Sequence, residues 1–342
     1  MILAGDIGGT KSNLALYELD EQGYHKAFEL RFASRESGAF DEIIEMFLSE
    51  AKKTLRNAHA LRIEAAGFGV AGPVIDRRVK ATNLPWSVDA ATLAKQLSTD
   101  HVVLLNDLEA TGYSLERLKP SEISVLNPGL PSPRSTQALV AAGTGLGEAF
   151  LFWEGNRYVV GSSEGGHADL APRTDLEIEL LRYMKNRHEF VSVELILSGR
   201  GFRAIHDFLD PTVKHSTFNG PDADAAPEIT RLGLEGICPV CVRTLEMWVA
   251  LYGAETGNLA LKVLARGGVW VAGGIAVKIR AKMEDGTFFR AFCQKEKFAE
   301  LMSQIPVYMV LNEEAPLIGA MSQAIHAAGL AAGGKSQFEI GM

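Results

Sequence analysis

Short apolar segments that run directly into glycine residues recur in both halves of this 342-residue chain. They cover residues 2–6, 65–70, 139–142 and 269–272, and a glycine follows each of them within two residues. Runs this short, without polar alternation, are typical of buried strands, and glycine permits the tight turn that follows. We therefore predict an α/β protein whose second half repeats the strand-and-turn pattern of the first.

The order of the other predicted elements narrows the fold class. Strands are predicted at residues 12–19, 24–31 and 102–105, and a helix over residues 40–55, where apolar residues recur at helical spacing. Three strands thus precede the first helix, an order that fits neither a TIM barrel nor a simple doubly wound sheet. In the second half we expect a hairpin of residues 148–153 and 157–160, followed by helices over residues 175–187 and 240–265. A last strand is expected at residues 307–310.

Charge and composition exclude several classes of function. The net charge is −8 and the sequence has no basic block, so a nucleic-acid groove or a membrane-surface patch is not expected. No apolar stretch reaches about 18 residues without a charge, so no membrane span is predicted. The N-terminal residues lack the basic segment of a signal peptide, and the three cysteines suit a reducing compartment. We therefore expect a cytoplasmic protein.

Four glycine turns follow predicted strands, Gly165-Gly166 among them, and the first has the composition of a phosphate-binding turn. In Asp6-Ile7-Gly8-Gly9-Thr10, glycine lets backbone N–H groups approach an anion, the aspartate can orient a hydrated Mg²⁺, and the hydroxyl can contact phosphate. The second turn is Gly143-Thr144-Gly145-Leu146-Gly147, and Gly273-Gly274 follows a later apolar strand. A single glycine turn is usually structural. There is no Walker sequence, and the 143–147 spacing is shorter than the dinucleotide fingerprint, so neither a P-loop nor a Rossmann site is indicated.

Polar residues at two further places suit chemistry on hydroxyl groups. Asn106-Asp107 follows an apolar strand, where an aspartate can accept the proton of a substrate hydroxyl. The alternative is a helix N-cap, because the residues that follow have a helical pattern. Glu164-Gly165-Gly166-His167 combines a carboxylate acceptor with an imidazole that can donate or accept, which suits vicinal hydroxyls. A metal site is the alternative there, but no further ligands lie nearby at zinc-like spacing.

Cys238-Pro239-Val240-Cys241 is a single cysteine pair. A structural zinc site needs a second pair of ligands at suitable spacing, and Cys293 stands alone. We therefore interpret the pair as core residues on one side of a helix start, and we expect no metal ion held by the protein itself. Residues 210–227, rich in Pro, Asp, Asn and Gly, are predicted to form a loop.

Taken together, seven motifs resemble those of bacterial glucokinases of the proteobacterial type. In chain order they are Asp6-Ile7-Gly8-Gly9-Thr10, Thr82-Asn83-x-x-Trp86, Asn106-Asp107, Gly143-Thr144-Gly145-Leu146-Gly147, Glu164-Gly165-Gly166-His167, Ser198-Gly199 and Ala272-Gly273-Gly274-Ile275. The similarity covers nearly the whole chain. It implies the actin-like ATPase (ribonuclease H-like) fold, with a cleft between two α/β domains. We assign residues 1–117 and 308–330 to the small domain, residues 118–307 to the large domain, and residues 331–342 to a flexible tail.

The resemblance also implies a reaction, in which ATP with Mg²⁺ phosphorylates glucose to glucose 6-phosphate, and a role for each matching residue. Asp107 would be the general base for the 6-hydroxyl, and the other hydroxyls would contact Asn83, Asn106, Glu164, His167 and Glu194. The phosphates would contact Gly8, Gly9, Thr10, Gly143, Thr144 and Gly145, with Gly273 and Gly274 near the adenosine and Asp6 linked to Mg²⁺ through water. Taken alone, Glu194 would only favour a helix dipole. No role follows from the sequence for Glu148 and Arg200, which flank matching motifs.

Other functions stay open on the sequence. The same fold would serve a kinase for mannose, fructose or an amino sugar, a donor such as ADP or polyphosphate, or a sugar-sensing relative without activity. A DNA-binding repressor of this fold would need a helix-turn-helix before the first strand, which is predicted to begin at Ile2. We expect a homodimer that binds glucose and ATP, without a nucleic-acid or membrane partner.

Overall fold

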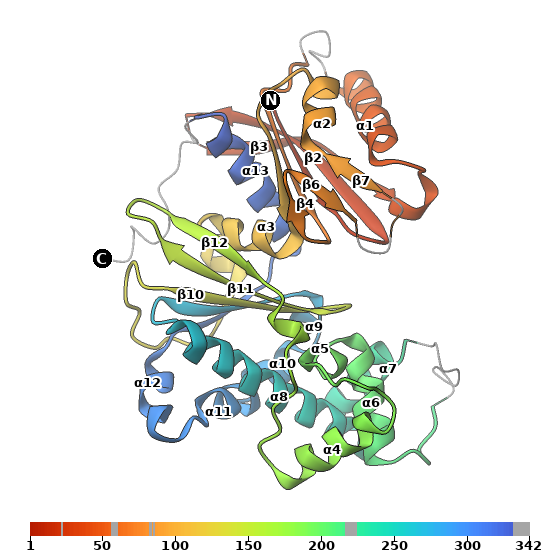
Figure 1. The fold of residues 1–342 in the computed structure, drawn as a ribbon, viewed down its shortest axis with the longest axis vertical. Coiled ribbons are helices and arrows are strands. Elements are labelled where there is room, and N and C mark those ends of the chain that lie inside the picture. Colours follow the sequence, from red (N-terminus) through yellow and green to blue (C-terminus); the bar gives the residue numbers. More distant parts are fainter. Residues whose placement is uncertain (22, 56–60, 82–83, 85, 216–223, 331–342) are drawn as a thin grey trace. The chain divides into compact units, whose positions relative to one another are not determined.

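The chain forms two compact units (Figure 1). We call them the first unit, which is Met1–Pro120 with the chain from Asn312 on, and the second unit, Ser121–Leu311. The computed structural model describes residues 1–330 except 22, 56–60, 82–83, 85 and 216–223. The predicted tail, residues 331–342, therefore lies outside the described residues.

A five-stranded sheet is the centre of the first unit. Its strand order is β3-β2-β1-β4-β8, in which β1, β2 and β3 are antiparallel neighbours and β1, β4 and β8 run parallel. The bounds are β1 Ile2–Ile7, β2 Lys11–Asp20, β3 Gly23–Ala33, β4 Ala65–Val70 and β8 Val102–Asn106. A smaller antiparallel sheet, β5 Val74–Ile75, β6 Arg78–Lys80 and β7 Ser87–Asp89, lies in the same unit.

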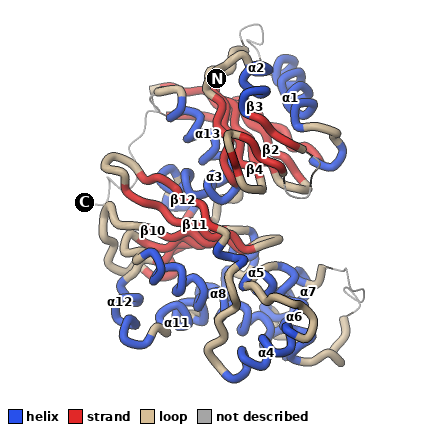
Figure 2. The backbone as a smooth tube through the Cα atoms, viewed as in Figure 1, coloured by secondary structure: helices blue, strands red, loops and turns tan. Residues whose placement is uncertain are grey.

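Helices cover both faces of the first sheet, as Figure 2 shows. Residues on alternate sides of β1 enter two separate cores, because successive strand residues point to opposite faces. Leu3 and Ile7 pack with α1 (Phe40–Thr54) and α2 (Ala90–Leu97), whereas Ile2 and Ala4 pack with α13 (Ala315–Ala327). Gly67 on β4 allows α13 to approach closely, since a β-carbon there would be 2.0 Å from the backbone oxygen of Ala320. The remaining elements are α3 Asp107–Ser114, η1 Ser34–Glu36, η3 Leu115–Arg117 and η4 Pro120–Glu122.

The second unit repeats this strand arrangement and adds one strand. Its order is β12-β11-β10-β13-β14-β9, with β10, β11 and β12 antiparallel, β10, β13 and β14 parallel, and β9 antiparallel to β14. The bounds are β9 Ile123–Asn127, β10 Gln137–Ala142, β11 Leu146–Trp153, β12 Tyr158–Ser163, β13 Gly268–Ala272 and β14 Val307–Val310. β10 thus corresponds to β1, and the turn after it corresponds to the turn after β1. The predicted repeat of the two halves is confirmed.

One long helix, α8 (Pro239–Val263), organises the core of the second unit. Its Trp248 stacks on Phe202 of α6 with ring centroids 4.7 Å apart, and its Tyr252 packs edge-on against Phe288 of α11. Such aromatic pairs bury large apolar areas, so they hold α6 and α11 firmly against α8. The other elements are α4 Asp175–Lys185, α5 Val193–Ile196, α6 Gly199–Leu209, α7 Ala226–Leu234, α9 Gly274–Lys278, α10 Arg280–Glu284, α11 Thr287–Cys293, α12 Ala299–Gln304, η5 Gly165–His167 and η7 Glu296–Phe298.

The loop predicted over residues 210–227 ends earlier than expected. Helix α7 already begins at Ala226 and includes Pro227, so the end of that prediction is wrong. Proline is tolerated in the first turn of a helix because its missing N–H has no intrahelical partner there. Residues 216–223 of this stretch lie outside the described residues.

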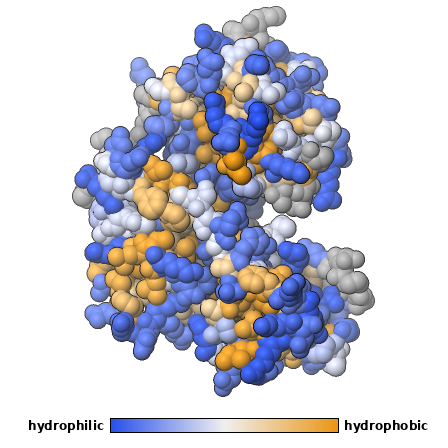
Figure 3. Space-filling view, viewed as in Figure 1, coloured by the Kyte–Doolittle hydropathy of each residue, from blue (hydrophilic) through white to orange (hydrophobic). Residues whose placement is uncertain are grey.

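In Figure 3, hydrophilic residues cover much of the visible face, with smaller apolar patches between them. Among the described residues, no single helix is long and apolar enough to cross a bilayer, although α7 and α8, bent by 103°, meet that criterion as a pair.

Candidate functional site

The carboxyl ends of three parallel strands meet at one edge of the first unit. Ile7 at the end of β1 is paired with Val70 of β4, and Val70 is paired with Asn106 at the end of β8. The turn after β1 and the start of α3 therefore follow the sheet at the same edge, which is where parallel sheets place ligand-binding groups.

The turn between β1 and β2 is held by hydrogen bonds on both sides. The N–H of Gly8 donates to the Lys11 oxygen at 3.0 Å, and the Ser34 hydroxyl donates to the Gly8 oxygen at 2.7 Å. The Ser34 N–H also donates to the Thr10 oxygen at 3.0 Å, while the Thr10 side chain is exposed. The turn is thus fixed in shape from the protein side, with Gly8 and Gly9 only half-buried.

Asp6 carries a perturbed carboxyl group at the end of β1. Burial is the main cause that raises its pKa to about 6, and the negative charge of Asp107 is the second cause. Two carboxyls that repel each other favour a cation in their neighbourhood. The predicted link of Asp6 to a hydrated Mg²⁺ fits this chemistry.

The structure shows which residue of Asn106-Asp107 is the N-cap of α3. Asn106 is the N-cap of α3, since its Oδ1 accepts from the Leu108 N–H at 2.9 Å and Glu109 Oε2 accepts from the Asn106 N–H at 2.9 Å. Asn106 Nδ2 donates to the Gly72 oxygen at 3.1 Å, so this side chain also ties α3 to the loop after β4. Asp107 is the next residue, and its Oδ1 accepts from the Leu108 N–H at 2.8 Å. The capping role therefore belongs to Asn106.

The corresponding turn of the second unit is braced by Glu194. Glu194, in the first turn of α5, accepts the Leu146 N–H on Oε2 at 3.0 Å, and Arg200 Nη2 lies 3.7 Å from its Oε1. The Gly143 N–H donates to the Gly145 oxygen at 2.8 Å, and the Gly199 N–H donates to the Gly143 oxygen at 2.9 Å. These contacts place Glu194 and Arg200 beside the 143–147 turn. The sequence alone did not predict either contact.

Gly273 lies beside the same turn. Strands β10 and β13 are paired through Ala141 and Ala272, so the turns that follow them are neighbours at one sheet edge. Gly273 has φ +89°, and a β-carbon there would be 2.3 Å from the Ala142 oxygen. Only glycine fits this combination of backbone conformation and close approach. Gly274 then begins α9 and is exposed.

Glu164 precedes the short helix η5, His167 is the last residue of that helix, and both side chains are exposed. Glu164 Oε2 and His167 Nε2 are 4.0 Å apart, with 75% and 61% of the side chains exposed. Their loop is fixed from below, because a β-carbon at Gly166 would be 2.0 Å from the Leu146 oxygen. The Val193 N–H donates to the Ala168 oxygen at 2.9 Å, which links this loop to the start of α5. The second unit thus brings together the 143–147 turn, the 164–167 loop and Glu194.

Glu148 is a buried acid under this loop, and sequence reasoning assigned it no role. It is 1% exposed, and its Oε1 has no hydrogen-bond partner within the described part of the chain. Burial raises its pKa to about 7, helped by Glu255 and opposed by Lys262. A β-carbon at Gly165 would be 2.1 Å from Glu148 Oε2, so the glutamate fills the space beneath Gly165. The sequence signal that could have revealed this buried acid is a glutamate at an inward position of β11.

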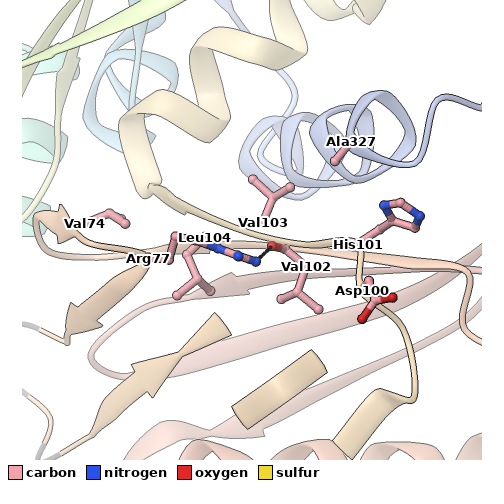
Figure 4. A pocket seen from close by; sticks show the side chains of 8 residues that line it. All are labelled: Val74, Arg77, Asp100, His101, Val102, Val103, Leu104 and Ala327. Atoms are coloured by element: carbon pink, nitrogen blue, oxygen red, sulfur yellow. Dashed lines mark hydrogen bonds between the residues drawn. The ribbon is translucent and has the colours of Figure 1, made fainter. Parts of the chain in front are cut away.

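A surface pocket of the first unit lies away from these residues (Figure 4). It has a volume of about 310 Å³ and is lined by Val74, Arg77, Ala327 and residues 100–104. Arg77 Nη2 donates to the Val102 oxygen at 3.3 Å at the start of β8, the end opposite Asn106. None of the predicted site residues lines this pocket. One of those residues, Asn83, lies outside the described residues.

The duplicated sheet order, with a glycine turn after the first strand of each sheet, defines an α/β protein of the actin-like ATPase fold. The fold class predicted from the sequence is confirmed. The chain belongs to the glucokinase family, because the family model described as "Glucokinase" matches residues 3–327. The resemblance that the seven motifs carry is thereby confirmed.

Individual relatives agree with this assignment. A protein named "Glucokinase" from Nostoc punctiforme is 37% identical over 341 residues, covering 94% of this chain and 97% of that protein. The crystal structure of a glucokinase from an Antarctic psychrotroph has a TM-score of 0.82 at 30% identity, covering 95% of this chain and 98% of that one. A glucokinase of the ROK family from Streptomyces griseus, in complex with glucose and AMPPNP, has a TM-score of 0.64 at 21% identity and covers 95% of this chain and 99% of its own. This last likeness concerns the fold.

Proposed function

We propose that this chain is a glucokinase, which transfers the γ-phosphoryl group of ATP to the 6-hydroxyl of glucose and releases glucose 6-phosphate and ADP. The family membership over residues 3–327 supports the reaction class. The observation that carries the mechanism is that the charge of Asp107 repels the Asp6 carboxyl beside a glycine turn, at the carboxyl edge of the first sheet.

In this mechanism Asp107 is the general base. Its carboxylate accepts the proton of the 6-hydroxyl while that oxygen forms a bond to the γ-phosphorus. The bond from the γ-phosphorus to the bridging oxygen breaks, and ADP leaves with the electron pair. Because Asn106 caps α3, Asp107 is available for this step without loss of the helix start.

The phosphate groups are expected to contact backbone N–H groups of both units. Gly8, Gly9 and Thr10 are assigned to the phosphates in the first unit and residues 143–145 in the second, at topologically equivalent turns. The N–H groups of Gly8 and Gly143 already donate to the Lys11 and Gly145 oxygens, so the other residues of each turn would supply the N–H groups. Gly273 and Gly274 are assigned to the adenosine. Mg²⁺ would be held through water by Asp6 and would neutralise charge on the phosphates. The position of Asp6 on β1 just before the glycine turn, with a second carboxyl charge on Asp107 acting on it, supports this assignment.

The sugar hydroxyls are assigned to Asn83, Asn106, Glu164, His167 and Glu194. Exposed Glu164 and His167 lie near each other, and a carboxylate beside an imidazole can pair with two neighbouring hydroxyls. A site that pairs hydroxyls rejects an epimer because buried polar groups then lose their partners, which costs several kcal/mol. Glucose in the complex of the S. griseus protein is consistent with this preference.

The deciding experiment is a coupled assay of sugar 6-phosphate formation with MgATP and a panel of hexoses. Turnover that depends on glucose, with little on mannose, fructose or N-acetylglucosamine, supports the proposal. Turnover on a different hexose would change the proposed substrate and leave the proposed mechanism unchanged. A folded protein without turnover on any sugar would reduce the function to sugar or nucleotide binding.

Location, assembly and domain boundaries also stay proposals. We propose a cytoplasmic homodimer, to be tested by fractionation and by light scattering coupled to size exclusion. We further propose that residues 1–117 with 308–330 and residues 118–307 move as separate domains around the sugar, which limits hydrolysis of ATP by water. Small-angle scattering with and without glucose would detect that closure.

A further inference from the structure

Four metal-binding side chains from distant parts of the sequence meet at one end of helix α8. Cys238 is the N-cap of α8 and Cys241 lies in its first turn. His206 lies near the end of α6, and His215 follows that helix. Helices α6 and α8 pack against each other in the second unit, and both are labelled in Figure 1. All four residues belong to the described part of that unit.

The distances from His215 to the two cysteines match those of a tetrahedral metal site. His215 Nε2 is 3.7 Å from Cys238 Sγ and 3.6 Å from Cys241 Sγ. Bond lengths of about 2.3 Å to sulfur and about 2.0 Å to nitrogen separate such ligand atoms by about 3.5 Å in a tetrahedron. Ligand atoms of His206, His215 and Cys241 also lie within 4.8 Å of one another.

The surroundings of His206 favour a metal-binding orientation. Its Nδ1 lies 3.3 Å from Asp207 Oδ1, and Arg203 Nε donates to Asp207 Oδ2 at 2.6 Å. A carboxylate that accepts from Nδ1 fixes the tautomer with the lone pair on Nε2, the arrangement found behind metal-bound histidines. His206 and Cys241 are 0% exposed, Cys238 is 8% exposed and His215 is half-buried, so most of the group is shielded from water.

We propose that His206, His215, Cys238 and Cys241 bind one structural zinc ion. Two imidazole nitrogens with two sulfurs form a ligand set that zinc prefers, and four protein ligands leave no open position for a substrate. The ion would fasten the end of α6 and the chain after it to the start of α8. At its other end α6 begins with Gly199, which donates to the Gly143 oxygen of the glycine turn, so the same helix joins the metal site to that turn.

The first test measures metal content. The full chain is purified under reducing conditions and analysed by inductively coupled plasma mass spectrometry. We expect about one zinc ion per chain in the wild type, and at least about tenfold less in Cys241→Ser and His215→Ala. Cys293→Ser is the matched control, because Cys293 is the third cysteine, lies on α11 and is expected to keep its zinc.

A second test uses the wild-type protein alone and so does not depend on how well a variant folds. The ion is removed with a chelator under reducing conditions, and the protein is titrated with Zn²⁺ against a chromophoric competitor and with Co²⁺. We expect a lower thermal midpoint after removal, its recovery with Zn²⁺, and a Co²⁺ spectrum of tetrahedral thiolate coordination. Wild-type protein that lacks zinc and binds it no tighter than Cys241→Ser does would overturn the proposal. A disulfide between Cys238 and Cys241 in freshly isolated, metal-free protein would also overturn it.

Discussion

The carboxylate of Glu194 occupies the space that a side chain at Gly145 would need. A β-carbon at position 145 would be 2.4 Å from Glu194 Oε2, the same oxygen that accepts the Leu146 N–H. The position of the glutamate therefore requires a glycine at 145. In return, its carboxylate accepts a hydrogen bond from the backbone of the turn.

Gly145→Ala should destabilise the second unit. The added methyl must displace either the braced glutamate or the turn, and overpacking of this kind costs about 1–3 kcal/mol. Gly143→Ala is the matched control, because a β-carbon there has no described atom within 4 Å and the change should stay within about 0.5 kcal/mol. Urea unfolding of both variants measures the difference, and equal losses would show that Glu194 does not brace the turn.

Asp6 should make the stability fall as the pH rises from about 4 to about 6. Its folded pKa of about 6 exceeds the ordinary value of 3.8, so the folded state holds the proton more tightly. The contribution of Asp6 to the free energy of unfolding is complete below its unfolded pKa and is lost as the pH rises through its folded pKa. The free energy of unfolding should fall by about 3 kcal/mol over this range. Urea unfolding across this window should show the fall in the wild type and its absence in Asp6→Asn.

The same titration has an internal control in Asp107→Asn. Removal of the Asp107 charge should lower the pKa of Asp6 and so narrow the pH range over which stability falls. The fall should not disappear, because burial is the larger cause of the raised pKa. Parallel stability curves for the wild type and Asp6→Asn would contradict the raised pKa.

Much of the fold could be predicted because its strands are short apolar runs ended by glycine. Strands β4 and β14 begin and end at the predicted residues. The strands β5, β6 and β7 are too short to show an alternating pattern, and among the described strands they pair with one another alone. Short helices such as α9 and α12 were likewise missed, since each is too short for a helical pattern and buries only a residue such as Ala276 or Met302 in the core of the second unit.

The site was predicted by residue type and motif, without the partners that fix each residue. Glu194 bonds to Leu146 across 48 positions, and no local pattern reveals such a contact. His206 and His215 lie beside the cysteine pair because α6 packs on α8. A search of the sequence for a second cysteine pair could not find these two histidines. Tertiary packing, which brings distant side chains together, supplied what spacing alone could not.

Glu148→Gln should stabilise the protein at alkaline pH. The folded pKa of Glu148 is about 7 against an ordinary 4.5, so its contribution to stability is present below the unfolded pKa and is lost as the pH rises through 7. At about pH 8 the variant should exceed the wild type by about 3 kcal/mol, and the two should converge near pH 4. Glu154→Gln, a change of an exposed acid in the same unit, is the control. A gain that is equal at both pH values would argue against ionisation of Glu148 as its cause.

Asp107→Asn should lower kcat by a factor of about 10²–10⁴, because the amide cannot accept the proton of the 6-hydroxyl. Glucose should still bind, and the thermal midpoint should change little, since Asn106 and not Asp107 caps α3. Asp100→Asn, the loss of an exposed carboxyl in the same unit, is the control and should keep full turnover. Coupled kinetics with calorimetric binding of glucose separate the two quantities. Near-normal turnover of Asp107→Asn would remove this residue as the base, whereas loss of glucose binding with intact folding would make it a sugar ligand first.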